Sequence, residues 1–122
     1  MKLHIAQTAS NLVTSYGEGY VTVLRDRYEQ SVVVFPDSVI PDWAPQSFEN
    51  LRAEDFAPVL AGNPEIVLLG TGEKQRFPRP EVLRPLIESG RGFEVMDTAA
   101  ACRTYNILVA EGRRVAAAIL MR

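Results

Sequence analysis

The sequence contains one cysteine and one histidine, and this scarcity removes several kinds of chemistry at once. A disulfide within the chain needs two cysteines, and a structural zinc site needs about four Cys or His ligands. A catalytic Cys102 would need a base beside it, and the sole histidine, His4, belongs to the N-terminal segment. The G-x-S-x-G elbow of serine hydrolases is also missing. The sequence therefore favours a protein that is not an enzyme, with no catalytic residue, metal or cofactor, and with Cys102 as a small buried hydrophobe.

Long apolar runs and a basic excess are missing as well. No segment approaches the roughly 20 apolar residues that span a bilayer, and residues 1–5 lack the apolar run of a secretion signal. The formal net charge is −2, from 13 Lys and Arg against 15 Asp and Glu, whereas general nucleic-acid binders carry a basic face. We therefore expect a cytoplasmic protein, with neither membrane insertion nor a nucleic-acid partner.

What the sequence does contain is ordinary for a globular protein. It has 122 residues, of which 47% are hydrophobic and 23% charged. A chain of this length buries roughly two thirds of its unfolded surface, which is enough for one core. Because no repeat, low-complexity tract or linker interrupts it, we predict a single domain over residues 1–122.

The N-terminal half has the pattern of β-structure. Strand-like runs over residues 12–16 and 20–24 flank a glycine turn, residues 25–27 have the composition of a second turn, and residues 28–35 form a third run. We interpret these three runs as an antiparallel meander. The proline-rich stretch that follows is a connector with a short strand at residues 38–40, and Trp43 is expected to cover the core.

The C-terminal half alternates strands and helices. Strands are predicted at residues 65–69, 93–96 and 115–121, and helices from residue 79 or 80 to residue 89 and over residues 99–111. The segment from Arg52 or Ala53 to Leu60 also has helical spacing, and because Pro58 falls within it, either the helix is short or Pro58 lies in its first turn. Two strands joined by a crossover helix run parallel in one sheet. The pattern therefore predicts a βαβαβ unit after the meander, which is an α/β fold.

Two loops of this unit could carry a site. Gly70, Thr71 and Gly72 follow the most apolar strand, but neither a dinucleotide fingerprint nor a P-loop is present. These residues form either a sharp turn or a ligand-contact loop, since ligands bind at the carboxyl ends of parallel strands. Asp97 and Thr98 follow the next strand, where one of them would cap the helix and the other could face a cavity.

On the helix itself, Arg103 and Asn106 share a polar face, and Arg103 could bind an anion or pair with a nearby carboxylate. The residues of the candidate pocket are Gly70, Thr71, Gly72, Asp97, Thr98, Arg103, Thr104 and Asn106.

Three ordered motifs resemble those of the Mth938-like family of unknown function: G-T-G at residues 70–72, M-D-T at residues 96–98, and T-Y-N-I-L followed by E-G-R over residues 104–113. The resemblance covers nearly the whole chain and implies a compact three-layer domain with a mixed sheet. It implies no established activity and no agreed cofactor. Animal relatives in the family include a mitochondrial complex I assembly factor and an adipogenesis-associated protein. All the candidate positions except Arg103 correspond to family motifs.

Three functional hypotheses remain open at this point. The first is a non-catalytic interaction module that assembles a protein complex, with an unknown protein partner. The second is a protein that binds a small ligand or anion in a cleft between residues 70–72 and the helix start at Asp97 and Thr98, because free N–H groups there suit an anion. The third is a homodimer formed through a sheet edge or the strand at residues 115–121, as opposed to a monomer.

Overall fold

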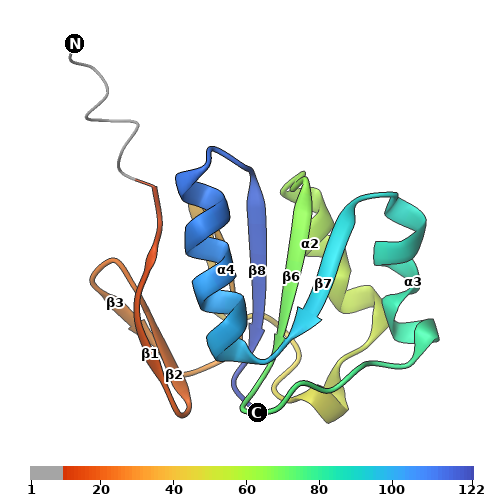
Figure 1. Cartoon of the computed structure of the whole chain (residues 1–122). Coiled ribbons are helices and arrows are strands. Elements are labelled where there is room, and N and C mark those ends of the chain that lie inside the picture. Colours follow the sequence, from red (N-terminus) through yellow and green to blue (C-terminus); the bar gives the residue numbers. More distant parts are fainter. Residues whose placement is uncertain (1–9) are drawn as a thin grey trace.

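A five-stranded mixed sheet forms the middle layer of the structure, a computed structural model that describes residues 10–122 (Figure 1). Its strand order is β5-β4-β8-β6-β7, where the strands are β4 (Val32–Phe35), β5 (Ser38–Ile40), β6 (Ile66–Thr71), β7 (Gly92–Met96) and β8 (Val115–Leu120). A separate three-stranded sheet contains β1 (Val13–Gly17), β2 (Tyr20–Val23) and β3 (Asp26–Tyr28). His4 lies outside the described residues.

The predicted βαβαβ unit is confirmed. Strand β6 pairs in parallel with both β7 and β8, so that Leu69 lies opposite Val95 on one side and Ala118 on the other. The connecting helices are α3 (Pro80–Ser89) between β6 and β7, and α4 (Thr98–Ala110) between β7 and β8. Strand β4 is antiparallel to both β8 and β5, which makes the sheet mixed.

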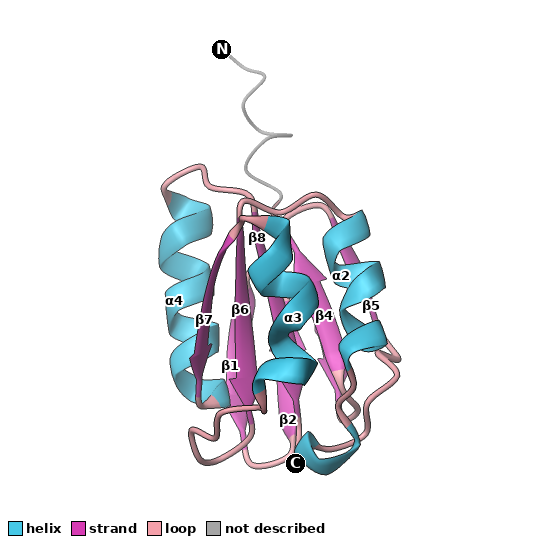
Figure 2. Ribbon diagram, turned by 90° about the vertical axis from the view of Figure 1, so that its right-hand side faces the viewer, coloured by secondary structure: helices cyan, strands magenta, loops and turns pink. Residues whose placement is uncertain are grey.

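Each face of this sheet is covered, and its side chains alternate between two cores. Val33 packs in the core beneath α3 and α2 (Ala57–Ala61), while Val32 and Val34 pack in the core beneath α4 and the meander. Figure 2 shows α2 and α3 lying over the first face, and Figure 1 shows α4 and the β1–β3 sheet on the other. Double coverage explains why the central strands are continuous apolar runs and not alternating ones.

The antiparallel meander is confirmed, but its predicted third strand was wrong. Asp26 and Arg27, expected in a turn at residues 25–27, form with Tyr28 the strand β3, whose partner is β2. The valine-rich β4 belongs to the other sheet, where all four of its residues are buried. The chain turns between β2 and β3 at Leu24, which adopts a positive φ of 54°. A strand as apolar as β4 needs cover on both faces, which an edge of the small meander cannot provide.

Helix boundaries follow the expected local signals. Pro80 begins α3, and Gly90 ends it in the left-handed conformation. The short helix before β6 consists of the 3₁₀ turn η2 (Ala53–Phe56) continued by α2, with Pro58 in the first turn of α2. A further 3₁₀ turn, η1 (Phe48–Asn50), lies in the connector. Trp43 is buried as expected, and its indole N–H donates to the Asp55 carbonyl oxygen at 2.8 Å.

Within residues 10–122, no helix combines the length and the apolar character that crossing a bilayer requires. The strand at residues 115–120 cannot pair with a second copy of the chain as hypothesised, because β8 is bonded on both sides, by β4 and by β6.

Candidate functional site

The carboxyl ends of β6, β7 and β8 meet at one edge of the sheet, at the bottom of Figure 1. The chain leaves β6 toward α3 on one face and leaves β7 toward α4 on the opposite face. In open α/β sheets, such a reversal creates a crevice beyond the strand ends, and ligands bind there. Gly72, Asp97 and Thr98 therefore lie where a site is expected.

Gly72 and Thr98 are joined by reciprocal hydrogen bonds. The Gly72 N–H donates to Thr98 Oγ1 at 2.9 Å, and the Thr98 N–H donates to the Gly72 carbonyl oxygen at 2.8 Å. The Thr98 hydroxyl donates in turn to the carbonyl oxygen of Leu120 at 3.0 Å. One threonine thus ties together the ends of β6 and β8 and the start of α4.

Asp97 is the N-cap of α4. Its Oδ1 accepts a hydrogen bond from the Ala100 N–H at 2.8 Å, an interaction that contributes about 1 kcal/mol to helix stability. With Asp97 in this role, Thr98 is the residue of the pair whose side chain links neighbouring elements at the sheet edge.

A cleft of about 470 Å³ opens between this edge and the β1–β2 turn. We call it the hairpin cleft, and its lining comprises Tyr16, Gly17, Glu18, Gly19, Gly72, Glu73, Asp97, Thr98, Ala99, Leu120 and Met121. Figure 1 shows the β1–β2 turn at the same end of the molecule as the arrowheads of β6, β7 and β8. A smaller hollow of about 410 Å³ adjoins it and shares Glu18, Gly19, Glu73 and Met121.

Two carboxyl groups meet at the rim of the hairpin cleft. The pKa of Glu18 is raised because its carboxyl hydrogen-bonds to that of Glu73, whose negative charge also repels it. Both side chains come from turns, Glu18 from the β1–β2 hairpin and Glu73 from the loop after β6. The rim is therefore a place where negative charge is concentrated.

The other candidate residues serve the fold in different ways. Gly70 lies against α4, since a Cβ added there would stand 3.1 Å from Thr98 Oγ1 and 3.3 Å from Ala101 Cβ. Thr71 is fully buried, and its hydroxyl donates to the Lys74 carbonyl oxygen at 2.5 Å, closing the loop after β6. The structure brings Gly72, Asp97 and Thr98 together in the cleft, and neither Gly70 nor Thr71 lines it.

The three helix positions lie beyond the cleft. Arg103 donates to the Tyr16 hydroxyl at 3.2 Å, a bond that raises the pKa of the guanidinium. Asn106 binds the backbone of Val13 in β1, and Thr104 is half-buried on α4. Arg103 thus contacts a residue of the cleft wall without lining the cleft itself.

The sequence-based prediction missed the contribution of the hairpin. Glu18 and its two flanking glycines were interpreted as a turn only, and Met121 was interpreted as the last residue of a strand. No local signal in the sequence places this turn over the end of the main sheet, because the two sheets are packed through tertiary contacts between β1 and α4.

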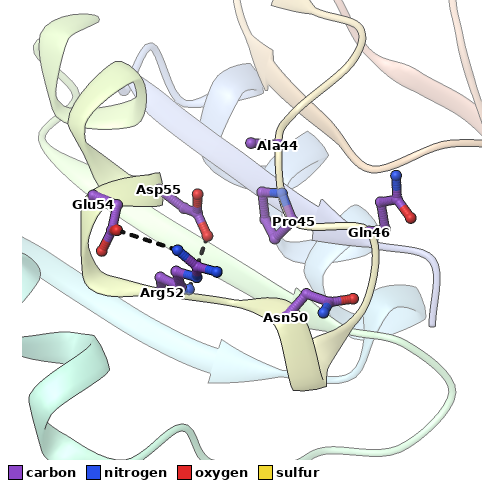
Figure 3. A pocket seen from close by; sticks show the side chains of 7 residues that line it. All are labelled: Ala44, Pro45, Gln46, Asn50, Arg52, Glu54 and Asp55. Atoms are coloured by element: carbon purple, nitrogen blue, oxygen red, sulfur yellow. Dashed lines mark hydrogen bonds and ion pairs between the residues drawn. The ribbon is translucent and has the colours of Figure 1, made fainter.

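Another hollow, in the connector, shows less evidence of a binding site. It measures about 370 Å³ and is lined by Ala44, Pro45, Gln46, Asn50, Arg52, Glu54 and Asp55 (Figure 3). Its charged groups bind one another: Arg52 lies 3.7 Å from Glu54, and its backbone N–H donates to Asp55 at 2.8 Å. Because these contacts cap and brace η2, we assign no site there.

Residues 10–122 give little support for a metal site or a reactive thiol. No three side chains of His, Cys, Asp or Glu converge there in a way that could hold a metal ion. Cys102 lies on the buried face of α4, and desolvation raises the pKa of its thiol to about 12. A thiol with such a pKa stays protonated and unreactive at neutral pH.

Residues 13–120 match a family model described as "Protein of unknown function (DUF498/DUF598)". The chain is 45% identical over 72 residues to the "13 kDa major membrane protein" of Francisella tularensis subsp. holarctica, covering 59% of this chain and 58% of that protein. It is 34% identical over 110 residues to the mouse (Mus musculus) "NADH dehydrogenase (ubiquinone) 1 alpha subcomplex assembly factor 3", covering 88% of this chain and 59% of that protein. The chain therefore spans under two thirds of the length of either relative.

Solved structures show the same fold. A crystal structure of a Bordetella parapertussis protein superposes with a TM-score of 0.85 at 42% identity, covering 92% of this chain and 96% of that one. A solution structure from Bordetella pertussis, described as a Mth938-like domain, has a TM-score of 0.78 at 38% identity, with coverages of 93% and 87%. The resemblance to the Mth938-like fold inferred from the motifs is thereby confirmed.

Proposed function

Because this chain belongs to the DUF498/DUF598 family of Mth938-like domains, whose description names no activity, we propose from its relatives that it is a non-catalytic module for assembling a protein complex. One observation carries the proposal: 88% of the chain aligns with a mouse protein named as an assembly factor for NADH dehydrogenase. The aligned part corresponds to almost the whole domain described here. The partner we propose is accordingly a subunit of a respiratory NADH dehydrogenase complex.

The chemistry of the domain supports this proposal. Cys102 is protonated at neutral pH, and the Thr98 hydroxyl is occupied by hydrogen bonds within the protein. Nucleophilic catalysis requires an activated nucleophile next to a base, and neither residue is arranged in that way. An interaction module needs only a stable surface, which the two-core sheet provides.

The proposal is tested by capturing partners from cells that produce the chain at native abundance. The tagged chain is cross-linked, purified and analysed by quantitative mass spectrometry, with a tagged chain carrying Phe56→Asp in the buried core as the control for unfolded capture. We expect the same NADH dehydrogenase subunits in every repeat with the wild-type chain only. Repeated recovery of no such subunit, or equal recovery with the unfolded control, contradicts the proposal.

A second candidate function is the binding of a small molecule in the hairpin cleft. The observation in its favour is the volume of about 470 Å³, which lies in the usual range for ligand pockets. A thermal-shift screen of metabolites tests it, with Ala99→Leu as a variant that fills the cleft from the first turn of α4. Stabilisation of the wild-type chain that Ala99→Leu abolishes is the expected result; a screen without stabilisation counts against it.

A further inference from the structure

The hairpin cleft has an apolar interior. Met121, which follows β8, and Ala99 on α4 supply aliphatic surface above the fully buried Leu120, and Tyr16 at the side is 36% exposed. The polar groups at its base are already satisfied, because Gly72 and Thr98 bond to each other and to Leu120. The interior therefore suits an aliphatic chain better than a polar ring or a sugar.

Among residues 10–122, the charged side chains that line the cleft are all acidic: Glu18, Glu73 and Asp97. Three cations, Lys74, Arg76 and Arg122, line the adjoining hollow and not the cleft. Arg76 donates to Glu49 at 3.3 Å and to the Thr71 carbonyl oxygen at 2.9 Å, while Arg103 donates to the Tyr16 hydroxyl. Glu18 and Glu73 both line the cleft and repel each other, and a cation beside them would relieve this repulsion.

An apolar interior with an acidic rim matches a Lys or Arg side chain, whose aliphatic stem packs on apolar surface while its charged head stays at the edge. We propose that the hairpin cleft receives a Lys or Arg side chain of the protein that this domain helps to assemble, an inference that rests on the proposed function. The stem lies along Met121 and Ala99, the head lies beside Glu18 and Glu73, and the Tyr16 ring offers a cation–π contact.

The same features argue against an anion, the ligand expected for a helix N-terminus. The Thr98 and Ala100 N–H groups of the first turn of α4 are bonded to Gly72 and Asp97, so they are not available to a phosphate or carboxylate. The acidic rim would also repel an anion, since Glu18, Glu73 and Asp97 carry the same sign of charge.

The test uses a short blocked peptide with one lysine between leucines, titrated into the full chain and followed by backbone amide NMR. We expect saturable shifts at Gly19, Gly72 and Ala99, and about tenfold weaker binding when the lysine is Nε-acetylated, because acetylation removes the charge. The double variant Glu18→Gln with Glu73→Gln should bind the lysine peptide about tenfold more weakly. The matched control, Glu88→Gln with Glu111→Gln, removes the same charge from exposed positions outside the cleft and should bind like the wild type.

Three results would overturn the inference: no shifts at the cleft amides, equal binding of the acetylated peptide, or unchanged binding by the double variant. Free cadaverine is titrated in parallel, and if it saturates the cleft more tightly than the peptide does, the occupant is a small amine and not a protein side chain.

Partner capture with the double variant separates this inference from the proposed function. If the variant retains the NADH dehydrogenase subunits that the wild type captures, the inference fails while the assembly function stands. If the wild type captures none, the assembly function fails and the inference fails with it.

Discussion

The side chain of Asn106 makes the two hydrogen bonds to the Val13 backbone that a neighbouring strand would otherwise make. Its Nδ2 donates to the Val13 carbonyl oxygen at 2.7 Å, and its Oδ1 accepts from the Val13 N–H at 2.9 Å. A side chain in α4 thereby satisfies both backbone groups of a residue in β1, 93 positions earlier in the chain. Tyr105 adds a third link, since its hydroxyl donates to the Asn11 carbonyl oxygen at 2.8 Å. These bonds hold the meander against α4 and so place the β1–β2 turn at the cleft.

Replacing Asn106 with alanine should therefore loosen the meander. The variant leaves the partly buried backbone groups of Val13 without their partners, which we expect to lower the free energy of unfolding by about 1–3 kcal/mol. Urea titration measures the loss, and hydrogen exchange should show faster exchange in β1. The neighbouring Ile107 is 59% exposed, so Ile107→Ala should change stability by less than about 0.5 kcal/mol. Equal effects of the two substitutions would contradict this interpretation.

A side chain at Gly70 should destabilise the fold. An added Cβ would stand 3.2 Å from Thr98 Cα and 3.3 Å from Ala101 Cβ, so that α4 must shift away from β6. We expect Gly70→Ala to cost about 1–3 kcal/mol, the usual range for overpacking in a core. Gly92, in the edge strand β7, provides a matched control because its Cβ would meet nothing nearer than 3.5 Å. Calorimetry should therefore show a lower melting temperature for Gly70→Ala and little change for Gly92→Ala.

The Cys102 thiol should be protected in the folded protein and should make stability fall at high pH. Burial raises its pKa from 9.0 to about 12, so the folded chain keeps a proton that the unfolded chain loses. Because the unfolded state then binds fewer protons, the free energy of unfolding decreases as pH rises from about 9 to about 12.

Urea unfolding of the wild type and of Cys102→Ala over this range isolates the contribution of the thiol, since Tyr105, whose pKa burial also raises, is present in both chains. A thiol reagent at neutral pH should react slowly with the folded chain and rapidly after denaturation. Rapid reaction of the folded chain, or parallel pH profiles for the two chains, would refute the prediction.

The interaction between the Glu18 and Glu73 carboxyls should be measurable in a titration. Contact with Glu73 raises the pKa of Glu18, so Glu73→Gln removes the charge repulsion and should lower the Glu18 pKa toward its ordinary value. Side-chain carboxyl NMR measures this directly. Glu65 is an internal reference: its pKa is lowered by the hydrogen bond from Arg113, and it should be the same in both chains. A Glu18 pKa that does not move would show that the two carboxyls are independent.

The elements of the C-terminal half could be predicted because their signals are local. Pro80 is favoured in the first turn of α3, Gly90 takes the left-handed conformation at its end, and Asp97 caps α4. The convergence of Gly72 with Asp97 and Thr98 followed from the same reasoning, because parallel strands bring their carboxyl ends to one edge. That reasoning did not extend to Asn106, which lies two turns further along α4, roughly 12 Å from Thr98.

Local sequence patterns could not predict which segments pair with each other across long sequence separations. The apolar run of β4 indicates a buried strand but does not say which sheet buries it, so the meander was assigned the wrong third strand. In the same way, the sequence of a polar helix face does not tell whether it faces solvent or the open edge of a strand, and Asn106 faces the edge of β1.

The sequence by itself determined the order of strands and helices in the C-terminal half, the parallel βαβαβ unit and the meeting of three loop residues at its edge, because these depend on hydrophobic period, turn residues and the handedness of crossovers. Only the tertiary structure decided that the β1–β2 turn closes a cleft there and makes it acidic. The reason is physical: Glu18 and Glu73 come from separate sheets, and the packing of β1 against α4 brings them into contact.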